Sequence, residues 1–340
     1  MKYLLFNIKK SVGNIEHALN ILRAAIQEAV CLNRTLVVGT FTISADGNLG
    51  HTLKNISFNH YVDLDKVQIC RITEGDITQL NESFNYINAE NFDLEAYREN
   101  EVLSTKNNET ISTELNHQYR VIARKITTDK YSHSYADILV HFPASAEVDR
   151  LSDVVLNAIG TNLKTAKQRA KIHHGVDYAA NSDFYQTMTP QHATHYACLY
   201  LRYNNITATP EKLYATDIRQ IRAIFKRARI TKDRNVYVVS DSDDTDYFRS
   251  LKKRYALYRY YDFSELRALV SGRDKEKIDS AMLYSVEKNI LQYAAIKMLP
   301  FEDLSGFPII YGNSSHTTPW RYKFLSWYKS LIGHTAQYTV

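Results

Sequence analysis

The sequence predicts an α/β protein made of two doubly wound domains. Short apolar strand-like runs alternate with segments of helical spacing, and the alternation occurs as two consecutive sets. Between the sets lies Gly175–His195, a stretch with little periodicity that contains Pro190 and is the expected linker. We therefore expect an N-terminal domain over 1–185 and a C-terminal domain over 191–340, with the last helix as a candidate to pack back on the first domain. A chain of 340 residues has room for two domains of about 100–200 residues each.

The first set opens with a strand–helix–strand unit. An apolar strand over Tyr3–Ile8 is followed by a turn with Gly13 and Asn14, a helix over about Ile15–Leu32 and a strand over Thr35–Val38. In such a unit the first turn faces the ligand crevice, and the helix N-terminus offers N–H groups to an anion. Asn14 has a plain alternative as the N-cap of the helix.

The remaining elements of the first set are less regular. The pattern predicts strands at Val67–Cys70, Arg120–Ala123 and Asp137–Phe142, helices from Thr73 toward Tyr86 and from Ser152 to about His174, and a polar surface loop from about Ser104 to His117.

The second set is led by a strand over Ala197–Leu201 that is followed at once by Arg202. Ligands of open α/β sheets bind beyond the carboxyl ends of the strands, and the planar guanidinium fork suits a diphosphate. The alternative for Arg202 is a surface salt bridge that closes a strand. The later elements are a helix capped near Thr216–Asp217, strands at Asn235–Val239, near Tyr258–Tyr261 and at Pro308–Tyr311, and helices over Thr245–Lys253, about Asp274–Ala294 and from Pro319.

Composition excludes several classes of protein. The 42 Lys and Arg against 37 Asp and Glu leave a net charge of only +5, which falls short of a nucleic-acid-binding composition. Cys31, Cys70 and Cys198 are widely spaced within apolar runs, as expected of reduced core thiols and not of disulfides or a zinc site. Neither a signal peptide nor an apolar run of about eighteen residues is found. We expect a cytoplasmic protein with no membrane span, and association with a membrane surface stays open.

Two charged segments have alternative interpretations. Ser240–Asp244 matches the Asp-x-Asp pattern of a divalent metal site, but its acids lead into a helix, where acids are expected in the first turn. The basic helix around Arg219–Arg229 is expected to be a solvated outer face, with a nucleic-acid or lipid-headgroup patch as the alternative.

Several short motifs, in this order along the chain, resemble the peptide O-fucosyltransferase superfamily. They are Gly13-Asn14-Ile15-Glu16-His17, Leu32-Asn33-Arg34-Thr35-Leu36, Tyr61-Val62-Asp63-Leu64, Tyr200-Leu201-Arg202-Tyr203-Asn204-Asn205, Val238-Val239-Ser240-Asp241 and Ile309-Ile310-Tyr311-Gly312-Asn313-Ser314-Ser315-His316-Thr317. The superfamily's His-x-Arg-Arg-x-Asp signature has Tyr200 in place of its His and Asn205 in place of its Asp. The late motif is two residues shorter, so either Ser314–Ser315 or His316–Thr317 occupies the phosphate-contacting place.

The resemblance implies a GT-B fold, in which two Rossmann-like domains face a central cleft. It also implies an inverting, metal-independent glycosyltransferase that moves fucose from GDP-fucose to a protein or glycan acceptor and uses no further cofactor. Arg202 would offset charge on the leaving diphosphate, and Asn14 would position the sugar or the acceptor. The expected donor-binding residues are Gly13, Asp241, Asp279, Ser314, Ser315, His316, Thr317 and Thr318. Asp279 has the alternative of a solvated acid in the first turn of a helix.

Two further functions stay open at this point. The same fold could use another nucleotide deoxysugar as donor. Because the signature His and Asp are replaced, the chain could also be a catalytically silent nucleotide-sugar-binding protein.

Overall fold

The chain forms two compact units in a computed structural model. The model describes residues 1–8, 12–44, 52–71, 82–106, 109–126, 138–160, 196–200, 218–240, 245–271, 278–294, 296–299 and 309–311. Unit 1 comprises Met1–Val155 and Phe263–Asn289, and unit 2 comprises Leu156–Asp262 and Ile290–Val340. The expected linker lies outside the described residues, so the boundary predicted between 185 and 191 stays a prediction.

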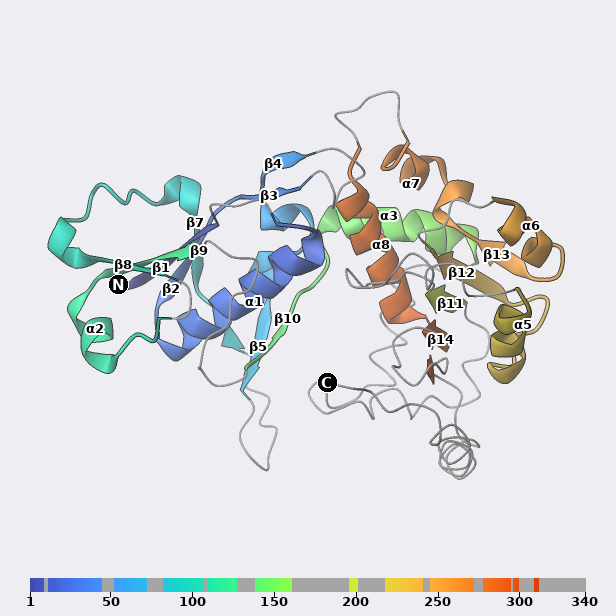
Figure 1. The fold of residues 1–340 in the computed structure, drawn as a ribbon, viewed down its shortest axis with the longest axis horizontal. Helices are drawn as coiled ribbons and strands as arrows, with labels where there is room; N and C mark the ends of the chain where they lie inside the picture. Colours follow the sequence, from blue (N-terminus) through green and yellow to red (C-terminus); the bar gives the residue numbers. More distant parts are fainter. Residues whose placement is uncertain are drawn as a thin grey trace, which may run out of the picture. The chain divides into compact units, whose positions relative to one another are not determined.

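Unit 1 is built on a parallel sheet (Figure 1). The strand order is β7-β2-β1-β9-β8, and each neighbouring pair runs parallel. The strands are β1 (Tyr3–Ile8), β2 (Thr35–Val38), β7 (Tyr86–Asn88), β8 (Val102–Lys106) and β9 (Val121–Ile126). From β1 the chain passes to β2 on one side, while β9 lies on the other side. The sheet therefore has a switch point between β1 and β9, the place where ligands bind in open α/β sheets.

Smaller antiparallel pairings complete the strands of unit 1. They are β3 (Phe41–Ile43) with β4 (Leu53–Ile56), and β5 (Gln68–Arg71) with both β6 (Glu82–Ser83) and β10 (Ile138–His141). Its helices are α1 (Ile15–Cys31), α2 (Thr113–Gln118), α7 (Ser264–Ala268), most of α3 (Ala146–Ala158) and most of α8 (Ser280–Tyr293), with 3₁₀ helices η1 (Phe58–His60), η2 (Leu64–Lys66), η3 (Ala89–Asn91) and η4 (Glu99–Glu101).

Unit 2 repeats the parallel arrangement in the order β13-β12-β11-β14-β15. Its strands are β11 (Ala197–Tyr200), β12 (Asn235–Val239), β13 (Ala256–Tyr258), β14 (Ile296–Leu299) and β15 (Ile309–Tyr311), its helices α5 (Ile218–Arg227) and α6 (Thr245–Lys252), and its 3₁₀ helix η8 (Tyr260–Asp262). The pairs run parallel except for β14 with β15. The switch point of this sheet lies between β11 and β14.

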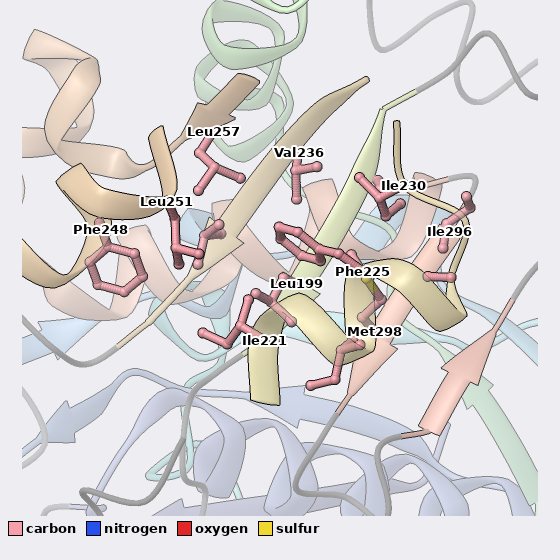
Figure 2. Packing of buried hydrophobic residues seen from close by; sticks show 14 residues of the cluster. Leu199, Ile221, Phe225, Ile230, Val236, Phe248, Leu251, Leu257, Ile296 and Met298 are labelled. Atoms are coloured by element: carbon pink, nitrogen blue, oxygen red, sulfur yellow. The ribbon is translucent and has the colours of Figure 1, made fainter. Parts of the chain in front are cut away.

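Alternating residues of the central strands form the core of unit 2 (Figure 2). Because successive side chains of a strand point to opposite faces, Ala197 and Leu199 of β11 lie on one face with Val236 and Val238 of β12. This face is covered by apolar residues of α5 and α6, namely Ile221, Ile224, Phe225, Phe248 and Leu251. The apolar stripe on α5 therefore faces the sheet, which leaves its basic residues Lys226 and Arg227 exposed.

The Leu32-Asn33-Arg34-Thr35-Leu36 motif has a structural explanation. Asn33 adopts a left-handed conformation with φ 52°, and Arg34 N–H donates to the carbonyl of Ala29 at 2.8 Å, which ends α1 in a Schellman motif. The Arg34 guanidinium then donates to the carbonyls of Tyr3, Asn116, Tyr119 and Arg120 and to Oδ1 of Asn116 at 2.6–3.1 Å. Burial lowers the pKa of Arg34 to about 10. The motif thus links the end of α1 by hydrogen bonds to the amino ends of β1 and β9.

Several expectations are confirmed and others are wrong. The strands at Tyr3–Ile8, Thr35–Val38 and Asn235–Val239 have the expected bounds. The polar loop expected over Ser104–His117 is wrong, because β8 runs to Lys106 by pairing with β9 and Ser112 caps α2. The helix expected to reach Tyr86 is wrong in its second half, which forms β6 and β7. β14 was not expected.

Cys31 also departs from the expected burial. It lies exposed in the last turn of α1, off the apolar face of that helix, whereas Cys198 is buried in β11; neither of these two cysteines forms a disulfide. Within the described ranges no helix has the length and apolarity needed to cross a membrane.

Candidate functional site

The Gly13–Asn14 turn lies where the chain enters α1 of unit 1. The turn is held by β3, since Val12 N–H donates to the Thr42 carbonyl and Ser44 N–H donates to the Val12 carbonyl, both at 2.8 Å. Asn14 has extended backbone angles, and its Oδ1 accepts a hydrogen bond from His17 N–H at 2.9 Å. Asn14 is therefore the N-cap of α1, which is the plain alternative that the sequence offered for this residue.

The described part of unit 1 leaves room for a side chain at position 13, so Gly13 is not required there for steric reasons. A Cβ added at Gly13 would meet no atom within 4 Å there. The described residues therefore do not explain a glycine here, and the donor-binding role of Gly13 stays a prediction.

In unit 2 the carboxyl ends of β11 and β12 lie side by side, paired at Tyr200 and Val239. Tyr200, Val239 and Ser240 are buried. The expected site residues that follow these strands or come late in the chain lie outside the described residues: Arg202, Asp241, Ser314, Ser315, His316, Thr317 and Thr318. Their positions stay predictions.

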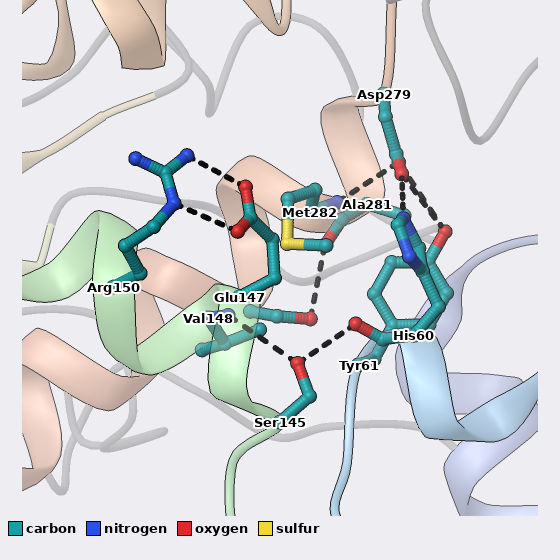
Figure 3. Close-up of polar contacts among 10 residues, drawn as sticks. His60, Tyr61, Ser145, Glu147, Val148, Arg150, Asp279, Ala281 and Met282 are labelled. Atoms are coloured by element: carbon teal, nitrogen blue, oxygen red, sulfur yellow. Dashed lines mark hydrogen bonds and ion pairs between the residues drawn. The ribbon is translucent and has the colours of Figure 1, made fainter.

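Asp279 is the predicted donor-binding residue whose surroundings the structure describes most fully (Figure 3). It immediately precedes α8, and its Oδ1 accepts a hydrogen bond from Met282 N–H at 2.9 Å, so it acts as a helix N-cap. The hydroxyl of Tyr61 donates to the same carboxylate at 3.2–3.3 Å. Nε2 of His60 lies 3.2 Å from Oδ2. We call Asp279, Tyr61 and His60 the Asp279 cluster.

These contacts give Asp279 a structural role at the start of α8, close to its alternative as an acid of the first helical turn. The side chain is less solvated than that alternative supposes, since it is only 14% exposed. The donor-binding role of Asp279 stays a prediction. Burial and the adjacent Asp279 carboxylate raise the pKa of Tyr61 well above its ordinary value, so Tyr61 stays protonated and donates to Asp279. All three residues belong to unit 1.

The backbone of the segment that contains His60 and Tyr61 is hydrogen-bonded to the start of α3. The Ser145 hydroxyl donates to the His60 carbonyl at 2.8 Å, and Ser145 N–H donates to the Tyr61 carbonyl at 3.1 Å. Asp63 N–H donates to the Pro143 carbonyl at 2.8 Å. The Tyr61-Val62-Asp63-Leu64 motif therefore joins the start of α3 to the residue that caps α8.

The cluster was not predicted from the sequence. In the sequence Tyr61 stands within a motif, and His60 carries no local signal of a function. Asp279 lies 219 residues from His60 along the chain, so no local spacing could link them. The one available signal is that Asp279 is an acid placed before a helix with an apolar face. This pattern predicts a helix N-cap, but it does not predict that Tyr61 and His60 contact the same carboxylate.

Metal ligands are not gathered in the part of the chain that the structure describes: no group of three or more His, Cys, Asp or Glu residues there could hold an ion. Asp241 and Asp243 of the Asp-x-Asp pattern lie outside that part.

The fold defines a mixed α/β protein with parallel sheets. No family model and no curated protein matches the sequence. Among solved structures, "POFUT1 in complex with GDP" has 10% sequence identity and a TM-score of 0.41, over 85% of this chain and 95% of that chain. "POFUT1 in complex with GDP-fucose" has 12% identity and a TM-score of 0.39, over 86% and 94% of the two chains. These are distant similarities of fold.

Proposed function

We propose that the chain is an inverting, metal-independent glycosyltransferase that moves fucose from GDP-fucose to a hydroxyl of a protein or glycan. The observation that carries the proposal is the topology of unit 2. β11 is flanked by parallel β12 and β14, which makes its carboxyl end a switch point. β11 ends at Tyr200, and Arg202 is the second residue after it in the sequence. Asp241 is likewise the second residue after β12.

The chemistry of these residues suits a nucleotide diphosphate. When the glycosidic bond loosens, negative charge builds on the leaving diphosphate, and a donor already in place stabilises it. Arg202 offers two parallel hydrogen bonds and a permanent charge. The hydroxyls and N–H groups of Ser314–Thr318 would hold the phosphates, and Asp241 would bind the ribose or the base. We leave Asp279 out of the donor site because its carboxylate serves α8, Tyr61 and His60.

The sequence motifs support the same class of enzyme. Their order along the chain is that of the peptide O-fucosyltransferase superfamily, and the proposal includes the GT-B arrangement, with the donor on unit 2 and the acceptor on unit 1. Asn14 would position the sugar or the acceptor. We also propose the cytoplasm as the place of action.

A thermal-shift experiment tests the donor. The full chain is heated alone and with GDP, GDP-fucose, UDP or dTDP, and only the guanosine compounds should raise the melting temperature. Stabilisation by UDP or dTDP instead would favour another nucleotide deoxysugar. If none of the compounds stabilises the chain, the proposal fails.

A second measurement separates an enzyme from a silent binding protein. Release of GDP from GDP-fucose is followed with water as the acceptor, with Arg202→Ala as the comparison. Wild-type chain that binds GDP-fucose and never releases GDP, even with protein or glycan acceptors added, would be a binding protein.

A further inference from the structure

His60 is held by Asp279 in one defined tautomer. A carboxylate only accepts hydrogen bonds, so Nε2 of His60, 3.2 Å from Oδ2 of Asp279, must carry the proton. In the neutral imidazole, Nδ1 then bears the lone pair and is the basic nitrogen. Among the residues that the structure describes, none is hydrogen-bonded to Nδ1.

The carboxylate that orients His60 is itself fixed. Met282 N–H and the Tyr61 hydroxyl both donate to Asp279, and Asp279 N–H donates to the Leu269 carbonyl at 2.8 Å. Tyr61 is 1% exposed. The Tyr61 ring packs at a tilt against Phe41 and edge-to-face against the His60 ring. Figure 3 shows His60 and Tyr61 converging on the Asp279 carboxylate.

The imidazole is nevertheless open to solvent. The His60 side chain is 47% exposed, against 14% for Asp279. A half-buried carboxylate behind an exposed, oriented imidazole is the arrangement in which histidine serves as a general base, because the carboxylate stabilises the imidazolium that forms.

The groups that face His60 include two carboxylates. Besides Asp279 and the neutral Tyr61, the group facing it from α3 is Glu147, whose carboxylate is paired with Arg150 at 2.7 Å. The pKa of Glu147 is lowered mainly by the hydrogen bond from Arg150 and to a smaller degree by His60. The pKa of Arg150 is raised, mainly by its hydrogen bond to Glu147 and to a smaller degree by Glu265 of α7. A proton on His60 would thus lie near two carboxylates.

We propose that His60 is the general base of the transfer and that Asp279 is its positioning residue. The inference rests on the proposed function. The acceptor oxygen forms a bond to the anomeric carbon of fucose while the bond from that carbon to the diphosphate oxygen breaks. The acceptor O–H proton passes to Nδ1 of His60, and GDP leaves with the bonding electron pair. The imidazolium then returns the proton to solvent, so atoms and charge balance.

The test uses hydrolysis of GDP-fucose by the full chain, with water as the acceptor, at pH values from 5.5 to 8.5. His60→Gln should lower kcat about 100-fold, with GDP-fucose affinity and melting temperature nearly unchanged. The wild-type rate should rise with pH, as catalysis by a general base requires, whereas the His60→Gln rate should stay flat. Asp279→Asn keeps a good helix N-cap and should lower kcat about tenfold.

His117→Gln is the matched control, since His117 is an exposed histidine of unit 1 outside the cluster. It should leave both kcat and the pH profile as in the wild type. A His60→Gln chain that hydrolyses within about threefold of the wild-type rate overturns the inference while the proposed function stands. A wild-type chain that binds GDP-fucose but releases no GDP, with water or with protein or glycan acceptors, overturns the inference together with the proposed enzyme activity, and one that does not bind GDP-fucose overturns the donor as well.

Discussion

Arg124 of β9 and Glu28 of α1 form an ion pair inside unit 1, with side chains 1% and 0% exposed. Nε of Arg124 donates to both oxygens of Glu28 at 3.2–3.3 Å, and Nη2 makes a further close contact with Oε1. The guanidinium also donates to the carbonyls of Lys106 at 2.9 Å and Glu109 at 2.7 Å. One buried charge pair thus joins α1 to the sheet and to the residues after β8.

Removing one member of this pair should destabilise unit 1. Glu28→Ala leaves a buried guanidinium without its counter-charge, and we expect unfolding free energy to fall by about 3–5 kcal/mol in urea titrations. Arg120→Ala is the control, because the side chains of the Arg120–Glu101 pair are 55% and 27% exposed and the pair should contribute less than about 1 kcal/mol. A Glu28→Ala effect as small as the control would contradict the prediction.

Asn14 can be tested for a role beyond capping α1. Ser is also a good N-cap, so Asn14→Ser should keep stability within about 0.5 kcal/mol, whereas Asn14→Ala should cost about 1 kcal/mol. If Asn14 also positions the sugar or the acceptor, both variants should lose at least about tenfold in turnover. Full activity in Asn14→Ser would leave Asn14 with the capping role alone.

The need for Arg202 and the independence of metal have the same electrostatic cause. The leaving diphosphate carries about two negative charges, which Arg202 and the Ser314–Thr318 segment would offset. Turnover should survive EDTA, and Arg202→Lys should fail nearly as badly as Arg202→Ala, by about two to three orders of magnitude, or about 3–4 kcal/mol of barrier. Nucleotide affinity should fall less. Loss of turnover in EDTA, with Arg202→Ala within about threefold of wild type, would instead support a metal at Asp241 and Asp243.

Lys297 of β14 should make stability rise with pH. Burial lowers the pKa of Lys297 to about 8, an effect that the neighbouring Cys198 opposes. The lysine of the unfolded chain has the higher pKa and therefore binds its proton more tightly than Lys297 in the folded chain. Keeping Lys297 charged in the folded chain costs free energy, and this cost disappears as pH rises from about 8 toward 10.5, so the folded chain becomes more stable. Lys297→Met should therefore be more stable than wild type at pH 7, by about 1–3 kcal/mol, and the difference should shrink by pH 10.

Urea unfolding of both chains at pH 7, 8, 9 and 10 measures this, and Cys198→Ala checks that the trend belongs to the lysine. A difference between wild type and Lys297→Met that does not change with pH would contradict the prediction.

The sequence by itself determined the elements whose signals are local. Helical spacing of apolar residues and an Asn cap placed α1 at Ile15–Cys31, one residue short of the expected end. Continuous apolar runs placed β1, β2 and β12, because strands buried on both faces need no polar alternation. The alternation of these elements was enough to predict parallel α/β sheets.

Tertiary structure decided what local patterns do not encode. The polar residues of β8 form a strand because β9 supplies their backbone hydrogen bonds, and β14 forms beside β11 although Lys297 interrupts its apolar run. The meeting of His60 with Asp279, and of Glu28 with Arg124, joins residues far apart in the chain. A sequence shows which side chains can carry charge or a proton, but only the packing of distant segments brings two of them within hydrogen-bond distance and removes the water that would otherwise weaken their interaction.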